Sequence, residues 1–143
     1  MPAPPLRDQD GKIIPHDHPD IFDDDYVLRH IVPPHDLHPD EARNVVRVSS
    51  GAYSESSDGG MSVDILRWMA GDHLDECYYL DDERMGATKV RVGDLRALGL
   101  LVGWDPDNGH PHHGAVWGIK QAHRRKIARG AITVREAHGE TSQ

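Results

Sequence analysis

The sequence predicts one domain of the α+β class, with a mixed or antiparallel sheet and two or three short helices. Its 143 residues match the usual length of a single domain. Short β-branched runs alternate irregularly with short helical patterns, which favours such a sheet over a regular βαβ repeat. We expect a flexible or peripheral, proline-rich and acidic arm over residues 1–24, the globular domain over residues 25–135 and a frayed tail over residues 136–143.

The strands are predicted from β-branched and aromatic runs that end at turn residues. The first covers Tyr26–Val32 and stops at two prolines, after which a polar connection over Pro34–Arg43 leads to a second strand at Val45–Ser49. Three clear strands follow, with a possible fourth at the end of the domain. These four segments are Ala87–Val92, Leu100–Trp104, Gly114–Ile119 and, last, Ala131–Val134.

The helices are predicted from capping residues and apolar spacing. Met61–Ala70 fits either a helix capped by Ser62 or, at its start, a short strand. An acidic connection over residues 71–86 follows it. Asp94 can cap a short helix at Leu95–Leu98, and Gln121–Arg129 forms a basic helix stopped by a glycine.

Composition narrows the cellular setting and the partners. One cysteine excludes an internal disulfide, no apolar run is long enough to span a membrane, and the N-terminus lacks the pattern of a signal peptide. We therefore expect a cytoplasmic protein without a membrane partner. The net charge of −8 argues against general binding to nucleic acid. The basic helix over residues 120–129 is the exception, because residues 117–135 carry six Lys and Arg and no acid.

A Ser/Gly-rich turn after the second strand carries the strongest candidate binding site. Arg47 offers a planar fork of donors, and Ser49 and Ser50 add hydroxyls, as phosphate-bearing ligands and acidic groups require. The structural alternative is that these serines satisfy the backbone of the turn. The sequence leaves both interpretations open.

The chain has eleven histidines, and the tightest cluster lies between residues 110 and 113. His110 and His112 have a spacing that some metal sites use, but a closed site needs three or four ligands, and no matching ligand spacing occurs elsewhere. Surface histidine is therefore the favoured interpretation, with a metal site as the alternative. The sequence identifies no cofactor.

Four segments resemble a family of small, uncharacterised bacterial proteins. They are Leu28–Ile31, Arg47–Tyr53 (RVSSGAY), Met61–Asp64 (MSVD) and Pro111–Lys120, which is similar to a P-x-H-A-x-V-x-G-K-K pattern. On that pattern His113 aligns with the histidine, Gly114 replaces an alanine and Ile119 replaces the first lysine. The resemblance spans roughly residues 26–134 and implies one domain without implying an activity.

The resemblance also suggests which polar residues converge. Arg29, Arg47, Ser49, Ser50 and His113 are expected to line one pocket, with Lys120 as a further ligand-binding candidate. The leading hypothesis is a binding domain for an anionic small molecule or for an acidic segment of a protein partner.

Two alternative functions stay open. An arginine on one strand and serines on the next loosely resemble the NAD site of ADP-ribosyltransferases, for which Glu136 and Glu140 are the candidate catalytic acids. The other alternative is an accessory protein of a bacterial defence or toxin module, whose acidic segments would meet a basic partner.

Overall fold

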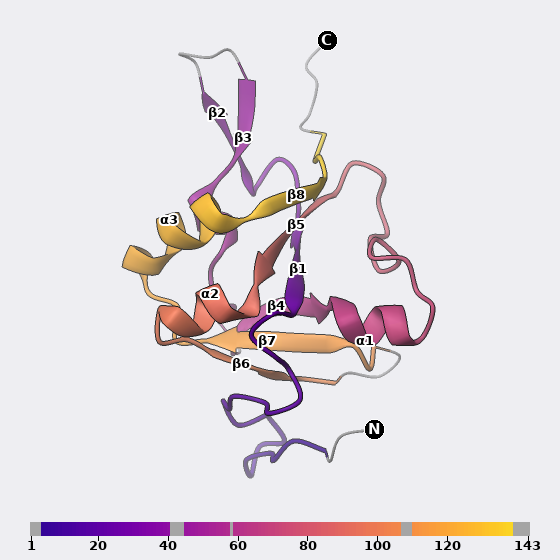
Figure 1. Ribbon diagram of the computed structural model, residues 1–143. Coiled ribbons are helices and arrows are strands. Elements are labelled where there is room, and N and C mark those ends of the chain that lie inside the picture. Colours follow the sequence, from indigo (N-terminus) through magenta and orange to yellow (C-terminus); the bar gives the residue numbers. More distant parts are fainter. Residues whose placement is uncertain (1–3, 41–44, 58, 107–109, 139–143) are drawn as a thin grey trace.

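The computed structural model describes residues 4–40, 45–57, 59–106 and 110–138. Within them, six strands form an antiparallel sheet in the order β6-β7-β4-β1-β5-β8, and β2 pairs with β3 in a separate hairpin (Figure 1). The strands are β1 Tyr26–Ile31, β2 Leu37–Asp40, β3 Val45–Val48, β4 Met61–Ile65, β5 Gly86–Arg91, β6 Leu101–Trp104, β7 His113–Trp117 and β8 Ile132–Arg135. The helices are η1 Ser50–Ala52, α1 Leu66–Gly71, α2 Val92–Ala97 and α3 Gln121–Gly130. The predicted α+β class is confirmed, and the sheet is the antiparallel alternative.

Strand β2 lies inside the segment predicted to be a polar connection. It covers Leu37–Asp40 and pairs along its length with β3. Proline lacks the N–H that a central strand needs, so Pro39 weakens the sequence signal for a strand. A two-stranded hairpin has only edge strands, and there proline is tolerated. The prediction of a connection was wrong for this reason.

The ambiguous segment at residues 61–70 contains both predicted structures in succession. Residues Met61–Ile65 form β4, and α1 begins at Leu66, so Ser62 lies within a strand and caps no helix. Helix α2 begins at Val92, which places Asp94 in its first turn and corrects its predicted role as the cap. None of the helices in the described part of the chain is long and apolar enough to cross a membrane.

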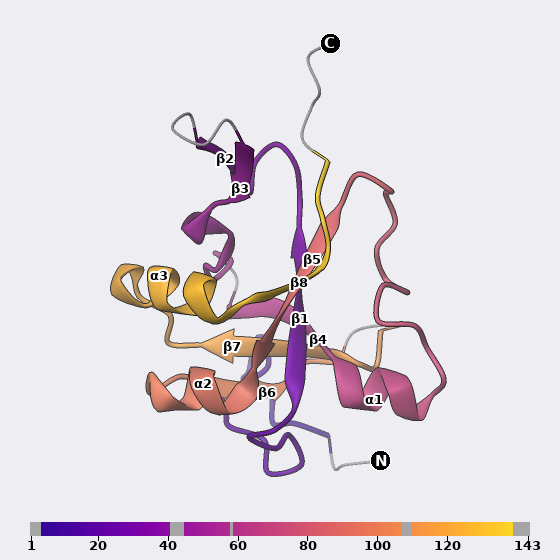
Figure 2. The same ribbon diagram turned by 45° about the horizontal axis from the view of Figure 1, so that its top comes forward.

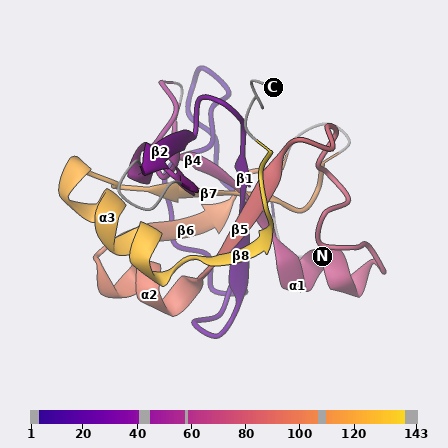
Figure 3. The same cartoon turned by 90° about the horizontal axis from the view of Figure 1, so that it is seen from above.

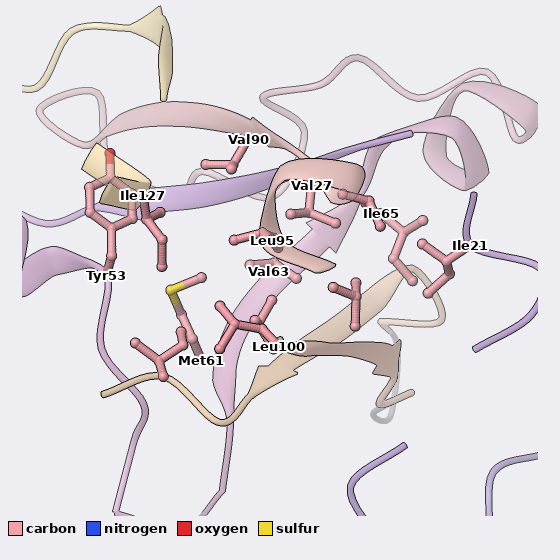
Figure 4. Close-up of a cluster of buried hydrophobic side chains, with 14 of the residues drawn as sticks. Ile21, Val27, Tyr53, Met61, Val63, Ile65, Val90, Leu95, Leu100 and Ile127 are labelled. Atoms are coloured by element: carbon pink, nitrogen blue, oxygen red, sulfur yellow. The ribbon is translucent and has the colours of Figure 1, made fainter. Parts of the chain in front are cut away.

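The hydrophobic core lies between the sheet and the helices that follow β5 and β7. Leu95 of α2 is fully buried and lies among Val27 of β1, Val63 of β4 and Leu100 (Figure 4). These side chains are at most 3% exposed. Ile127 brings α3 into the same cluster, so the basic helix is fixed against the domain by its apolar side.

Part of the segment predicted as an arm contacts this core. Ile21 is 1% exposed and belongs to the hydrophobic cluster, and His18 is also buried. Gly103 of β6 permits the approach, because a Cβ there would lie 2.6 Å from the His16 carbonyl oxygen. Arg96 of α2 donates hydrogen bonds to the carbonyl oxygens of His18 and Ile21. The structure therefore places residues 16–21 against β6 and α2.

Candidate functional site

A cavity of about 780 Å³ opens between the β2–β3 hairpin, α3 and the sheet. The sheet contributes Ile31 of β1, Thr88 of β5 and Thr133 of β8 to its lining. Seen from above, the hairpin and α3 lie on the same side of β5 and β8 (Figure 3). The volume is within the range of roughly 300–1,000 Å³ that is typical of sites for small ligands.

Three of the residues predicted to bind a ligand line this cavity together. Arg47 comes from β3, while Ser49 and Ser50 lie at the start of η1. The Ser49 hydroxyl oxygen accepts a hydrogen bond from the Gly51 backbone N–H at 3.1 Å. Ser49 therefore satisfies the backbone of the turn, as the structural alternative predicted. Its own O–H group is still able to donate. Ser49 therefore satisfies the turn and faces the cavity at once.

Arg29 supports this site through its contact with η1 and does not line the cavity. Its guanidinium donates to the Ala52 carbonyl oxygen and to the Ser62 carbonyl oxygen, both at 2.9 Å. These bonds tie η1 to β1 and β4. Burial lowers the pKa of Arg29, and the nearby Asp36 carboxylate opposes that shift. Arg29 thus holds the turn that presents Ser49 and Ser50.

The basic helix supplies the other charged wall. Arg125 and Arg129 are four residues apart on α3 and both line the cavity. Neither makes a hydrogen bond or ion pair within the described residues. Arg135 also lines the cavity, although its guanidinium donates to the carbonyl oxygens of Met85 and Asp82. Four arginines therefore face this space, against Glu136 as the one acid among the described lining residues.

Two of the predicted residues lie elsewhere. Lys120 is exposed at the start of α3 and does not line the cavity. His113 begins β7 and pairs with Asp64 of β4, and its Nδ1 donates to the Asp105 carbonyl oxygen at 2.7 Å. The structure therefore does not bring His113 or Lys120 together with Arg47, Ser49 and Ser50.

His113 lies instead beside a second polar cluster, which is centred on Asp64. This carboxylate is 2% exposed and accepts from two imidazoles, His30 Nε2 at 2.7 Å and His110 Nε2 at 2.9 Å. A carboxylate only accepts hydrogen bonds, so both imidazoles carry a proton on Nε2. Burial lowers the pKa of His110, and the Asp64 charge opposes that shift.

A Tyr–His–Asp chain adjoins the Asp64 cluster and anchors the acidic connection. Tyr79 donates its O–H to His112 Nδ1 at 2.7 Å, and His112 Nε2 donates to Asp72 at 2.5 Å. The Tyr79 ring also stacks on the His110 ring, with centroids 3.7 Å apart. Burial, with Asp64 and Asp72 nearby, raises the pKa of Tyr79. This arrangement keeps the Tyr79 phenol neutral and holds the connection against the start of β7.

These contacts bear on the predicted histidine metal site. His110 and His112 hydrogen-bond to different carboxylates, those of Asp64 and Asp72. In the described ranges, no group of three or more His, Cys, Asp or Glu side chains is placed to hold a metal ion. His110 and His112 therefore each bind a different carboxylate in this structure and do not form a shared group of metal ligands within the described residues.

The lowered pKa values of two buried histidines lead us to expect that the free energy of unfolding depends on pH. Burial lowers the pKa of His18 and of His110 below their ordinary value of 6.5. The unfolded chain then binds protons more readily than the folded chain at these two positions. The contribution of the two neutral histidines to the free energy of unfolding is therefore kept above about pH 6.5 and is lost as the pH falls below it. We expect urea unfolding to show this loss between about pH 7 and pH 5. The variant His18→Asn/His110→Gln, which keeps one hydrogen-bonding group at each site, should flatten that dependence, whereas exposed His35→Gln should not. An unchanged slope in the double variant would contradict this account.

The sequence contained signals for the residues that were missed. Arg125 and Arg129 have the four-residue spacing of one helix face, but only the docking of α3 places that face beside Arg47. Asp64 is an acid between the apolar residues Val63 and Ile65 of one strand, which marks a buried charge in need of partners. His30, which donates to Asp64, lies 34 residues away along the chain. The sequence therefore places His30 on a strand but does not indicate that Asp64 is its partner.

The comparisons with known proteins give no family assignment. No protein-family profile, no curated protein and no solved structure matches the chain.

Proposed function

We propose that the chain is a binding domain whose arginine-lined cavity holds an anionic group, either a phosphate or a carboxylate. The observation that carries the proposal is the meeting of Arg125 and Arg129 from α3 with Arg47 from β3 around one space. Arginine binds both oxyanions in a two-point geometry, and such charge-assisted hydrogen bonds are about twice as strong as neutral ones. We place this activity in the cytoplasm, on the sequence grounds given above.

The spacing of the arginines supports an anion as the missing partner. Like charges four residues apart on a helix destabilise it by roughly 0.2–0.5 kcal/mol. A bound anion between Arg125 and Arg129 would turn that repulsion into attraction. Ser49 and Ser50 would supply hydroxyl donors from the opposite wall. Arg29 would act indirectly, by fixing η1 through the Ala52 carbonyl oxygen.

The test is calorimetric titration with inorganic pyrophosphate at low ionic strength. We expect Arg125→Ala/Arg129→Ala to weaken binding at least tenfold, because each lost charge-assisted hydrogen bond is worth about 1.5–3 kcal/mol. Lys126→Ala is the matched control, since Lys126 is exposed on the same helix and does not line the cavity. Its affinity should stay within about twofold of the parent protein. Equal losses in both variants, or no binding by the parent protein, would contradict the proposal.

An NAD-consuming transferase is the second candidate function. The observation that favours it is that Glu136, one of the two candidate catalytic acids, lines the same cavity as Arg47, Ser49 and Ser50. The other candidate, Glu140, lies outside the described residues. Release of nicotinamide from NAD by purified protein, lost in Glu136→Gln, would support this function. No release would leave the binding function alone.

A further inference from the structure

The described part of the N-terminal arm covers the outer edge of the main sheet. Strand β6 ends the sheet and, within the described residues, pairs only with β7. On its other side the Val102 N–H donates to Asp17 Oδ1 at 3.1 Å, and the Val102 carbonyl oxygen accepts from the His18 N–H at 2.9 Å. The Trp104 N–H donates to His16 Nε2 at 3.1 Å. The arm therefore takes the place that a further strand would have, and Figures 1 and 2 show it beside β6.

The observed contacts require the imidazoles of His16 and His18 to be neutral. A neutral imidazole has one donor nitrogen and one acceptor nitrogen. His16 Nδ1 lies 2.8 Å from the Ile14 carbonyl oxygen, which only accepts, so Nδ1 carries the proton and Nε2 is the acceptor. His18 Nδ1 likewise accepts from the Asp20 N–H at 3.0 Å. Protonation would turn each accepting nitrogen into a donor that faces another N–H.

The charged groups near His18 act in opposite directions. Burial lowers the pKa of His18. The neighbouring His16 lowers it further, whereas the carboxylates of Asp20 and Asp17 raise it. Because burial is the largest of these effects, the closed arm favours the neutral imidazole.

Three tryptophan rings pack against the same imidazoles. The His16 ring lies 5.3 Å from the Trp117 ring of β7. The His18 ring packs in a T-shaped geometry with Trp68 of α1 and Trp104 of β6. Trp104 and Trp117 are at most 7% exposed, and none of the three rings carries a charge to balance an imidazolium. Proton uptake would therefore place a charge in a largely apolar contact, which is costly unless the contact opens.

Helix α2 anchors the C-terminal end of the arm through groups that keep their charge. Arg96 donates to the Ile21 carbonyl oxygen at 2.6 Å and pairs with Asp23 at 2.8 Å, and the Ile21 side chain is 1% exposed in the core. Arg96 also binds Asp17 and the His18 carbonyl oxygen, and these two contacts oppose opening. Histidine is the side-chain type that ordinarily changes charge between about pH 5 and 8. The anchor at Ile21 and Asp23 therefore persists when the contacts with β6 change.

We propose that residues 14–18 form an acid-sensitive strap over the edge of β6, closed while His16 and His18 are neutral and open when they are protonated. The freed main-chain groups of Val102 and Trp104 are then a template on which another extended segment can pair. The imidazoles favour the closed strap above about pH 6.5, and this preference is lost as the pH falls toward about 5. The strap is independent of the anion-binding cavity, which is lined by β5 and β8 at the opposite edge of the sheet.

The test is amide hydrogen exchange of the full chain at about pH 7.5 and about pH 5.5, with each rate divided by the intrinsic rate at that pH. Leu28 reports on global unfolding, because β1 is paired on both sides. We expect the protection of Val102 and Trp104, relative to that of Leu28, to fall about tenfold at the lower pH, since one unit of pKa shift corresponds to a tenfold change in the opening equilibrium.

Two variants identify the groups responsible. His16→Gln/His18→Asn keeps an acceptor at each position without a titrating group, so its relative protection should not change with pH. His35→Gln removes an exposed imidazole and should show the same fall as the parent chain. Relative protection in the parent chain that did not change with pH would overturn the inference. An equal fall in His16→Gln/His18→Asn would also overturn it, because the two imidazoles would then not control the strap.

Discussion

Replacing Asp64 with alanine is expected to lower the free energy of unfolding by about 2–3 kcal/mol, because two imidazole donors would lose their acceptor in a largely buried site. His30 and His110 both donate to this carboxylate, which joins β1 and β4 to the residues before β7. Their side chains are about one-quarter exposed, so water moderates the loss. Urea unfolding at neutral pH is the measurement.

Two variants show whether the lost acceptor causes the effect. Asp64→Asn keeps one acceptor oxygen and should cost about half as much. Asp72→Asn removes a charge whose side chain is 67% exposed, and it should cost less than about 1 kcal/mol. If Asp64→Ala were as mild as Asp72→Asn, the cluster would not be the structural joint described here.

Replacing Tyr53 with alanine is expected to cost more, about 3–5 kcal/mol, through the cavity left in the core. Tyr53 is 1% exposed, and its hydroxyl forms a 2.8 Å hydrogen bond with the hydroxyl of Thr88 on β5. Burial raises the pKa of this phenol, so it stays neutral at physiological pH. Urea unfolding of the purified variant is the measurement.

Tyr53→Phe separates the ring from the hydroxyl. It keeps the packing volume and leaves the Thr88 hydroxyl without its partner, for a cost of about 1 kcal/mol. Equal losses in Tyr53→Ala and Tyr53→Phe would show that the ring does not fill the core as described.

The segment from Arg47 to Tyr53 shows what the sequence could and could not predict about the site. Arg47, Ser49 and Ser50 are neighbours along the chain, so their shared cavity follows from local structure. The same segment also has a structural purpose, because Ser49 caps η1 and Tyr53 anchors it in the core. A pattern of residue types cannot separate these two roles, since both use the same hydroxyls and the same turn.

The errors came from contacts between distant parts of the chain. His113 was expected beside Arg47, but the register of β7 with β4 pairs it with Asp64. The arginines of α3 were identified as a basic surface, and only the burial of Ile127 decides where that surface lies. Strand order and helix docking depend on the sum of many contacts, which local periodicity does not encode.

The strands were easier to predict than their arrangement. Six of the eight strands in the described residues fall within the segments predicted from β-branched runs, to within one residue at either end, because each run is apolar and ends at a turn. The other two are β2, which contains Pro39, and β4, which continues directly into α1. In both, a competing signal masked the strand pattern.

One measurement tests the central claim most directly: a two-dimensional amide NMR titration of the full chain with inorganic pyrophosphate. The account predicts shifts at amides of β3 and η1, in α3 around Arg125 and Arg129, and in β8. Amides around Asp64 and His110 should stay unchanged, because that cluster is separate from the cavity. Shifts confined to the Asp64 cluster, or no shifts in either place, would contradict the claim that the arginine-lined cavity is the binding site.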